Sequence, residues 1–257
     1  MTDRADLDNI SIVLHQPRSP ENIGAAARAM RNMGLSRLVV VDPENFDIFR
    51  VLKMSTHGAS DIVKRIDVYD DLREALSSYN YVAGTSARLG KQRKFISPPR
   101  LARNLISISR ENRVAVLFGP EDRGLSNEDI HYCHALVHIP TAEFSSLNLA
   151  QAVMILCYEI FTADQEEKKE FAPRLASRHE LDGMYDQLKE LLVRISYINP
   201  ENPDYWMNHM RQFFTRLQFR AKEVSIIRGI CRQVNWYGKK CYEDGLQERE
   251  EDVIRDR

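Results

Sequence analysis

Two short apolar runs, each ending in a loop of small and polar residues, constrain this fold more than any other feature. The first run, Val114–Phe118, stops at a Gly-Pro pair and is followed by the polar loop Glu121–Gly124. The second run, Ala135–Ile139, leads through a proline into a loop at 144–148, where an apolar helix begins. Apolar runs of this length between turn residues are typical of buried strands. Because ligands bind at the carboxyl ends of strands in open α/β sheets, this stretch predicts half of a ligand pocket.

The first two-thirds of the chain alternates predicted strands with predicted helices. The run Arg37–Asp42 is almost entirely apolar, as expected of a strand covered on both faces. Ser19-Pro20 is a typical helix start, and Asp70 is the predicted N-cap of a later helix. This alternation predicts an α/β fold with a mostly parallel sheet. Strands are predicted at 10–15, 37–42, 66–69, 79–84, 114–118 and 135–139, and helices at 21–33, 48–54, 59–63, 70–77, 98–110, from 126, and at 147–163.

A change of composition after residue 164 predicts a second structural unit. The charge run Gln165–Glu170 and Pro173 indicate a linker over 165–178. Only helical periodicity follows, over 181–196, 205–217 and 224–237, and the acidic tail after Cys241 is expected to fray. The sequence therefore predicts an α/β domain at 1–164, a linker at 165–178 and a small helical extension at 179–257.

The net charge is −1, but basic residues are concentrated in two segments, which we call the basic zones. The segment 88–103 holds six basic residues and no acidic one, and the segment 211–240 holds eight basic residues and one acidic, Glu223. Two such zones in a nearly neutral chain favour contact with a polyanion along a defined face, although a solvated helix face and an exposed loop would give the same pattern.

Several common sites are disfavoured by the sequence. No G-x-G-x-x-G follows the first strand, and the loop Gly119–Ser126 has no Gly-Lys-Ser/Thr, so neither a dinucleotide fold nor a P-loop is expected. The spacing of His131, Cys133, His134 and His138 matches no zinc pattern, so no metal is expected. The four cysteines are scattered, no apolar run reaches about 20 residues, and the N-terminus is polar. A cytoplasmic protein with reduced thiols is therefore expected.

Asn22 and Arg28 lie on one predicted helix, with Gly24 and four alanines that allow close packing. Alone, an exposed arginine that pairs with an acid would explain this pattern. In chain order, however, three segments together resemble the motifs of the SPOUT class (TrmH-like) of RNA 2′-O-ribose methyltransferases. The segments are Asn22–Arg28, Leu117–Leu125 and Ser145–Ala150.

Further segments resemble the bacterial subgroup of this class that methylates tRNA. These are Thr85–Arg88 and, in the helical extension, Phe214–Arg216 and Ile227–Ile230. The turn Ile139–Glu143 is one residue shorter than in some members of this class.

This resemblance implies a deep trefoil knot at the C-terminal end of the sheet. It also implies S-adenosylmethionine as cofactor, bound in a bent shape, and a homodimer whose active site is shared between subunits. The implied substrate is tRNA, modified at the ribose of nucleotide 32 (cytidine or uridine) in the anticodon loop. Neither DNA nor a membrane is an expected partner.

The resemblance also assigns roles to individual residues. The basic zones would contact tRNA phosphates, so deleting 165–257 is expected to weaken tRNA binding and spare cofactor binding. Catalytic roles fall on Arg28, Asn22, Ser146, Asn148 and Glu121. Cofactor binding falls on Thr85, Ser86, Ala87, Gly119, Gly124, Ile139, Ser145, Ser146 and Leu147. RNA binding falls on Arg88, Lys91, Arg93, Lys94, Arg211, Arg216 and Arg228.

A charged guanidinium cannot accept a proton, which limits the role that Arg28 can have in the reaction. Arg28 can act as a base only if it is locally neutralised. We favour the hypothesis that it positions the ribose hydroxyl or phosphate and stabilises developing negative charge. Two other functions remain open on the sequence: methylation of another tRNA or ribosomal RNA site, and RNA binding without catalysis.

Overall fold

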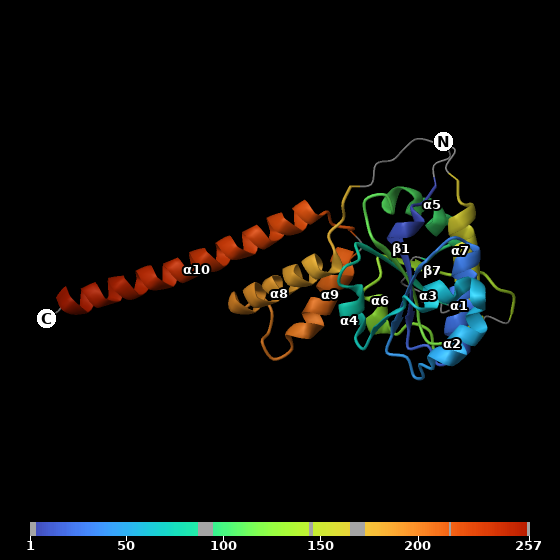
Figure 1. Cartoon of the computed structure of the whole chain (residues 1–257). Coiled ribbons are helices and arrows are strands. Elements are labelled where there is room, and N and C mark those ends of the chain that lie inside the picture. Colours follow the sequence, from blue (N-terminus) through green and yellow to red (C-terminus); the bar gives the residue numbers. More distant parts are fainter. Residues whose placement is uncertain (1–3, 87–94, 144–145, 165–172, 216, 256–257) are drawn as a thin grey trace.

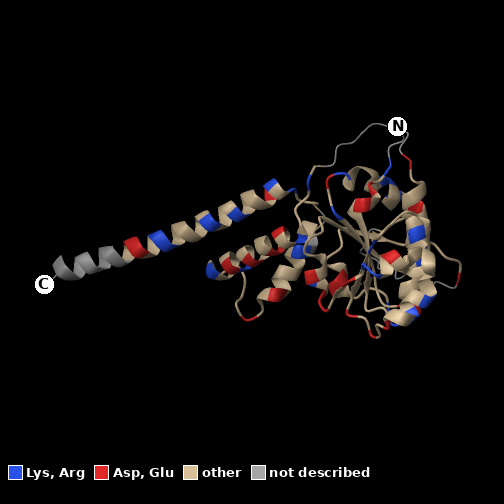
Figure 2. Ribbon diagram, viewed as in Figure 1, with Lys and Arg blue, Asp and Glu red and all other residues tan. Residues whose placement is uncertain are grey.

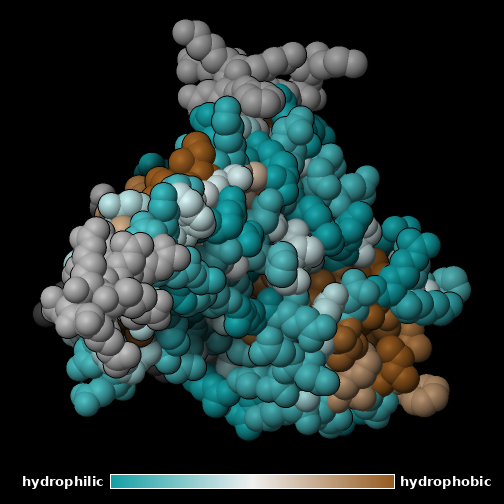
Figure 3. Space-filling model, turned by 90° about the vertical axis from the view of Figure 1, so that its left-hand side faces the viewer, coloured by the Kyte–Doolittle hydropathy of each residue, from teal (hydrophilic) through white to brown (hydrophobic). Residues whose placement is uncertain are grey.

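The computed structural model of this chain has two parts, an α/β body and a helical part from which one long helix projects (Figure 1). It describes residues 4–86, 95–143, 146–164, 173–215 and 217–255, and of residues 212 and 246–255 it describes the backbone alone. No helix within these ranges has the length and apolarity needed to cross a membrane. Seen from the side of the projecting helix, the surface is mainly hydrophilic, with hydrophobic side chains gathered mostly in one patch (Figure 3).

The body is built on a seven-stranded sheet in the order β3-β2-β1-β6-β4-β7-β5. All neighbouring strands are parallel, which confirms the predicted mostly parallel α/β sheet. The prediction omitted β5, because only two residues pair and they close a basic, polar segment. The strands are β1 (Ile10–His15), β2 (Arg37–Val41), β3 (Asp67–Tyr69), β4 (Tyr81–Thr85), β5 (Phe95–Ile96), β6 (Val114–Phe118) and β7 (Ala135–Val137).

Helices cover both faces of this sheet, so the central strands are apolar on both sides. One face is covered by α1 (Pro20–Asn32), α5 (Pro98–Ile108) and α7 (Leu149–Thr162), with α2 (Ile48–Ser55) packed against α1. The short helix α3 (Ser60–Val63) extends that layer. The other face carries α4 (Leu72–Leu76) and α6 (Asn127–Ile130). Short 3-10 turns precede β1 (η1, Leu7–Asn9) and α3 (η2, His57–Ala59).

Local capping chemistry sets the helix starts, and it corrects one prediction. Helix α4 is capped by Asp71, whose carboxylate accepts from the backbone N–H of Glu74 at 2.8 Å, and not by Asp70. The first residue of the helix is therefore Leu72, because a capping carboxylate accepts a hydrogen bond from an N–H two or three residues after the cap. Ser126 forms a capping box with Asp129 at the start of α6.

The helical part consists of α8 (Arg178–Arg194), α9 (Pro203–Thr215) and α10 (Ala221–Arg255), which share a small core. The prediction that the tail frays after Cys241 is wrong, since α10 continues to Arg255. Strong helix formers and an i,i+4 pair between Lys239 and Glu243 (3.8 Å) favour this continuation.

The described end of the predicted linker is tied to the body. The N–H of Leu175 donates to the Asn112 side chain at 2.7 Å, and its carbonyl accepts from the Asn80 side chain at 2.9 Å. The N–H of Arg178 donates to the carbonyl of Tyr79 at 2.8 Å. Helix α8 therefore starts from a fixed point beside the sheet, while residues 165–172 lie outside the described ranges.

Candidate active site

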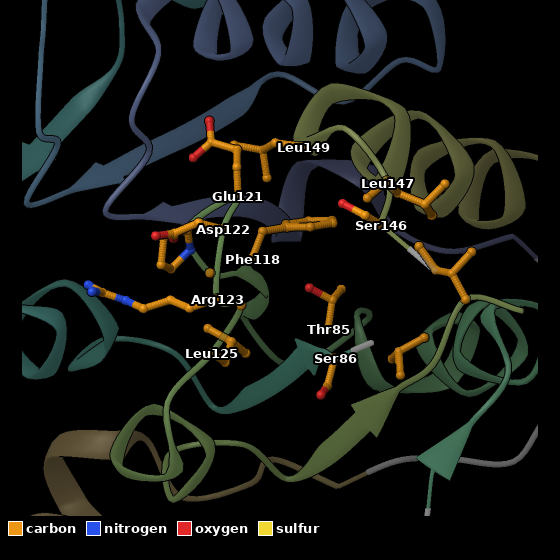
Figure 4. Close-up of a pocket in the computed structure, with 16 residues that line it drawn as sticks. Thr85, Ser86, Phe118, Glu121, Asp122, Arg123, Leu125, Ser146, Leu147 and Leu149 are labelled. Atoms are coloured by element: carbon orange, nitrogen blue, oxygen red, sulfur yellow. The ribbon is translucent and has the colours of Figure 1, made fainter. Parts of the chain in front are cut away.

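A cavity of about 300 Å³ opens at the carboxyl ends of β4, β6 and β7 (Figure 4). Apolar side chains, among them Phe118, Leu125 and Val137, form much of its wall. Polar groups reach it from the segments that follow the strands, including Thr85 and Ser86. Largely apolar walls with a few convergent polar groups are the usual build of a small-molecule site.

Segments far apart in the sequence meet in this cavity. The loop after β4, the loop after β6 and the segment before α7 each contribute to its lining. Two of the nine residues predicted to bind cofactor, Ala87 and Ser145, lie outside the described residues. The other seven all line the cavity: Thr85, Ser86, Gly119, Gly124, Ile139, Ser146 and Leu147.

Two glycines shape the loop that follows β6. A Cβ placed at Gly119 would collide with the backbone of Gly124 and Leu125, so the two ends of the loop approach closely only because residue 119 has no side chain. Gly124 has φ +64°, a left-handed conformation that glycine adopts without cost. The loop therefore folds back tightly at the wall of the cavity, with its backbone close to any ligand.

The neighbouring strand ends are held together by further hydrogen bonds. The hydroxyl of Thr85 donates to the carbonyl of Leu117 at 3.2 Å, which links β4 to β6. The N–H of Ser86 donates to the carbonyl of Val137 at 2.9 Å, which links the end of β4 to β7. These bonds fix the positions of three cavity-lining segments relative to one another.

A chain of hydrogen-bonded side chains lies at the edge of the cavity. The side-chain amide of Asn148 donates to the side-chain oxygen of Asn22 at 2.9 Å, and the amide of Asn22 donates to the Glu121 carboxylate at 2.7 Å. The second carboxylate oxygen of Glu121 accepts from the backbone N–H of Arg18 at 3.0 Å. The Asn148 side-chain oxygen also caps α7. Three of the five residues predicted to be catalytic are thus in direct contact, and Ser146 lines the adjacent cavity.

Arg28 stands apart from this group. It lies six residues after Asn22 on α1, which places it roughly 120° around the helix and about 9 Å along it. Its side chain is exposed, and within the described part of the chain it makes no hydrogen bond or ion pair. Within one chain, therefore, Arg28 does not join the Asn22–Glu121–Asn148 contacts.

Two residues that the sequence analysis did not select support the site. Arg18 pairs with Glu44 at 3.0 Å and with Asp122 at 3.3 Å, so its backbone N–H is held where it meets the catalytic candidate Glu121. Arg123 lines the cavity but extends away from Thr85 (Figure 4), because its guanidinium donates to the side chain of Gln16. Their position just after β1 and β6 was the available signal, since loops at these strand ends build the pocket.

His134 belongs to the group of histidines and cysteine for which the sequence predicts no metal, and its ring has structural contacts instead. The ring of His134 stacks on Tyr81 with centroids 5.3 Å apart, and its Nδ1 accepts from the N–H of Val82 at 3.1 Å. Burial, aided by the nearby positive charge of Arg178, lowers the pKa of His134 to about 3. No group of three potential metal ligands occurs among the residues that the structure describes.

The basic zones are only partly visible. Of the predicted RNA-binding residues, Arg88, Lys91, Arg93, Lys94 and Arg216 lie outside the described residues.

The two RNA-binding candidates that are described are half-buried. The guanidinium of Arg211 lies 5.6 Å from the Tyr185 ring centroid, and Nε of Arg228 donates to Gln187 at 3.2 Å. Both therefore pack within the helical part. Exposed cations are distributed along α10 instead (Figure 2), among them Arg232, Lys239 and Lys240.

Comparisons with known proteins agree with this geometry. The model of the SpoU rRNA Methylase family matches residues 9–158, and that of the tRNA methyltransferase TrmJ C-terminal domain matches residues 179–247.

Relatives match the chain over most of its length. A tRNA (cytidine/uridine/adenosine-2′-O-)-methyltransferase TrmJ from Pseudomonas aeruginosa is 39% identical, covering 87% of this chain and 93% of its own length. A tRNA (cytidine/uridine-2′-O-)-methyltransferase TrmJ from Pectobacterium atrosepticum is 37% identical, covering 89% and 97%. The crystal structure of TrmJ from Z. mobilis superposes with a TM-score of 0.77 at 28% identity, covering 88% of this chain and 98% of that one.

Proposed function

Because the chain belongs to the SpoU rRNA methylase family and carries the TrmJ type of C-terminal domain, we propose that it is a tRNA 2′-O-ribose methyltransferase. The methyl donor is S-adenosylmethionine. The observation that carries the proposal is the cavity at the strand ends with the Asn148–Asn22–Glu121 contacts at its edge. A pocket for a small ligand thus adjoins a polar group suited to hold a ribose.

The cavity fits the cofactor in size and chemistry. Its apolar wall, with Phe118 and Leu125, suits a buried adenine ring, and backbone groups near Thr85, Ile139 and Ser146 would satisfy the polar edge of that ring. When bound, the cofactor supplies an electrophilic methyl group on its sulfonium. The protein's own task is to bring the 2′-oxygen into line with that methyl and to assist loss of its proton.

The contacts support a division of catalytic roles. Asn22, Glu121 and Asn148 hold one another in place and orient the ribose. Arg28 stabilises the negative charge that develops on the 2′-oxygen. Its exposure on the far side of α1 supports a homodimer in which Arg28 of one subunit completes the site of the other.

The two parts of the chain have different proposed roles. Residues 1–164 form the methyltransferase domain, which carries a trefoil knot, and 179–257 form the tRNA-binding extension. The knot is supported by the way α7, which follows β7, returns to pack against both α5 and α1. A cytoplasmic location is proposed with this function.

The test is transfer of a labelled methyl group to a panel of tRNA transcripts. We expect transfer to nucleotide 32, detected by mapping ribose methylation, and none to a matched tRNA with a 2′-deoxy nucleotide at that position. Transfer to the deoxy-substituted tRNA, or to ribosomal RNA alone, would show that the target is another site. Cofactor binding without transfer to any RNA would indicate a binding protein, and the enzymatic proposal would be wrong.

A further inference from the structure

Helix α10 is much longer than the surface that it packs on. It has 35 residues, about 52 Å at 1.5 Å per residue, and among the residues that the structure describes it packs extensively against one other helix, the 17-residue α8. Val224, Ile227 and Cys231 face that contact. Past residue 235 the described residues of α10 are almost all exposed, so the distal half projects away from the rest of the chain (Figure 1).

A stripe of exposed apolar and weakly polar side chains follows a different face of α10. Its members recur at i, i+4, i+8, i+11 and i+15, which keeps them on one side of a helix. Four of them are 55%, 57%, 39% and 62% exposed, in chain order, and the fifth, a free cysteine, is also exposed. We call this set the apolar stripe: Ile226, Ile230, Val234, Tyr237 and Cys241.

We propose that the apolar stripe binds the same stripe of a second copy of this chain in an antiparallel helix pair. The stripe is symmetric about the point between residues 233 and 234. Antiparallel pairing about that point sets Ile226 opposite Cys241 and Ile230 opposite Tyr237, with Val234 beside the two-fold axis. Every member of the stripe then meets an apolar or weakly polar partner, as a two-fold self-association requires.

The charge along α10 selects the antiparallel direction. The sequence from Glu243 to Asp252 holds six acidic residues and one basic residue. In the antiparallel pair the first residues of this acidic segment, Glu243 and Asp244, lie beside the start of the partner subunit's α10, where Arg220 and Lys222 of the partner subunit are exposed. A parallel pair would set the two acidic segments side by side, and like charges across a helix interface are unfavourable.

The proposed pairing leaves the cations of α10 available. By helix geometry, Arg232 and Lys239 point roughly 160–180° away from the centre of the apolar stripe. One face of α10 can therefore meet RNA phosphates while another meets a second copy of the chain. The proposal needs no methyl transfer, so it can fail without affecting the proposed activity.

Disulfide trapping in the full-length protein tests both the contact and its register. The variant Ile226→Cys retains the native Cys241, and the pairing predicts a 226–241 cross-link between two chains under mild oxidation, because paired cysteines need Cα atoms within about 7 Å. The wild-type protein should not cross-link, since its two Cys241 residues would be separated by about 22 Å along the pair. The double variant I226C/C241S should not cross-link either.

Two further variants make the result decisive. Adding Ile230→Glu to Ile226→Cys should abolish the cross-link, whereas Arg232→Cys, on the cationic face, should not form one with Cys241. A cross-link that survives Ile230→Glu would reflect random collision, and a Cys241–Cys241 cross-link in the wild type would indicate parallel pairing. Absence of any 226–241 cross-link, with weaker tRNA binding in Ile230→Glu, would make the stripe an RNA contact. Each of these three outcomes overturns the proposal.

Discussion

The α/β body and the helical part differ in how completely they bury their apolar residues. In the body most apolar residues of the strands and helices fill two clusters, one on each face of the sheet, and a minority such as Phe49 and Tyr158 are exposed. Among the described residues of the helical part, seven buried residues form the core, while large side chains such as Trp206 (51% exposed) and Phe213 (59% exposed) remain at the surface.

This difference separates two kinds of recognition. A well-packed body can hold a cavity of fixed shape at the edge of its sheet, as a small ligand and a positioned reaction require. Exposed aromatic rings and cations on long helices form a surface for large partners, because stacking and phosphate contacts need reach more than enclosure. Changes in the body should therefore alter chemistry, and changes in the helical part should alter partner binding.

The sharpest separation is expected from Arg28→Ala. Loss of a group that stabilises developing charge typically costs 10²–10³-fold in rate, so single-turnover methyl transfer should fall by about 10³-fold. Cofactor affinity, measured by calorimetry, should stay within about twofold. Arg31→Ala is the matched control, since Arg31 is exposed on the same helix and pairs with Asp61 at 3.4 Å. Collapse of cofactor binding in Arg28→Ala would contradict its assignment to the RNA side of the reaction.

Arg178 joins the two parts, and its loss tests how far they are independent. The side chain is buried, its guanidinium pairs with Asp182 at 2.9 Å, and it lies over Tyr132 of the body and Tyr185 of α8. Removing one partner of a buried ion pair costs about 3–5 kcal/mol when the other charge is left unpaired. Because Asp182 also pairs with Arg73 at 3.0 Å, Arg178→Met should lower the free energy of unfolding by an amount at the lower end of that range, about 3 kcal/mol.

The control for that variant is Arg174→Met. Arg174 is 57% exposed and pairs with Glu180 at 3.2 Å, and such surface pairs contribute about 0–1 kcal/mol. Chemical denaturation followed by circular dichroism measures both variants. If the two variants have equal effects, Arg178 does not join the parts.

The sequence predicted the body better than the helical part, for a physical reason. Apolar runs indicate buried strands, and loops of small residues indicate where those strands end. The pocket around Gly119 and Ser146 could therefore be predicted from the sequence. The contact of Asn22 with Glu121 depends on the order of strands β1 and β6, which periodicity does not encode. The resemblance to a family assigned both residues to the catalytic group but did not predict their contact.

Charge patterns were less reliable guides to exposure. Arg211 and Arg228 belong to a basic zone, yet both are half-buried and pack between helices. A sequence does not distinguish a cation that snorkels across a helix interface from one that reaches solvent. The role of Arg178 could not be predicted either. Its side chain packs on two aromatic rings from different parts of the chain, and the sequence does not show that they meet.

The exposed cations of α10 give the next prediction. Replacing Arg232, Lys239 and Lys240 with glutamine should weaken tRNA binding and leave cofactor binding unchanged. If each meets one phosphate, the slope of log K against log salt becomes shallower by about 2 to 3. The wild-type advantage would then shrink about 16- to 64-fold between 50 and 200 mM salt. Filter binding over this range measures it, and an unchanged slope would place the RNA elsewhere.

The smallest effect is expected from His134, which lies where the two parts meet. Its pKa is lowered to about 3 in the fold, chiefly by burial and also by Arg178, against an ordinary value of 6.5. The unfolded chain therefore binds a proton below pH 6.5 that the folded chain rejects. Stability contributed by the neutral ring is full above pH 6.5 and declines as the pH falls, by about 1 kcal/mol per unit.

His134→Asn tests this pH dependence, because asparagine offers an oxygen to the N–H of Val82 but does not titrate. Relative to wild type, the variant should gain about 1 kcal/mol between pH 7.5 and pH 5.5, as measured by urea unfolding at both pH values. His179→Asn serves as the matched control, because it makes the same substitution at an exposed histidine. If His134→Asn shows a constant difference, the ring takes up protons in the folded protein just as it does in the unfolded chain. The charge of Arg178 would then not keep the His134 ring neutral.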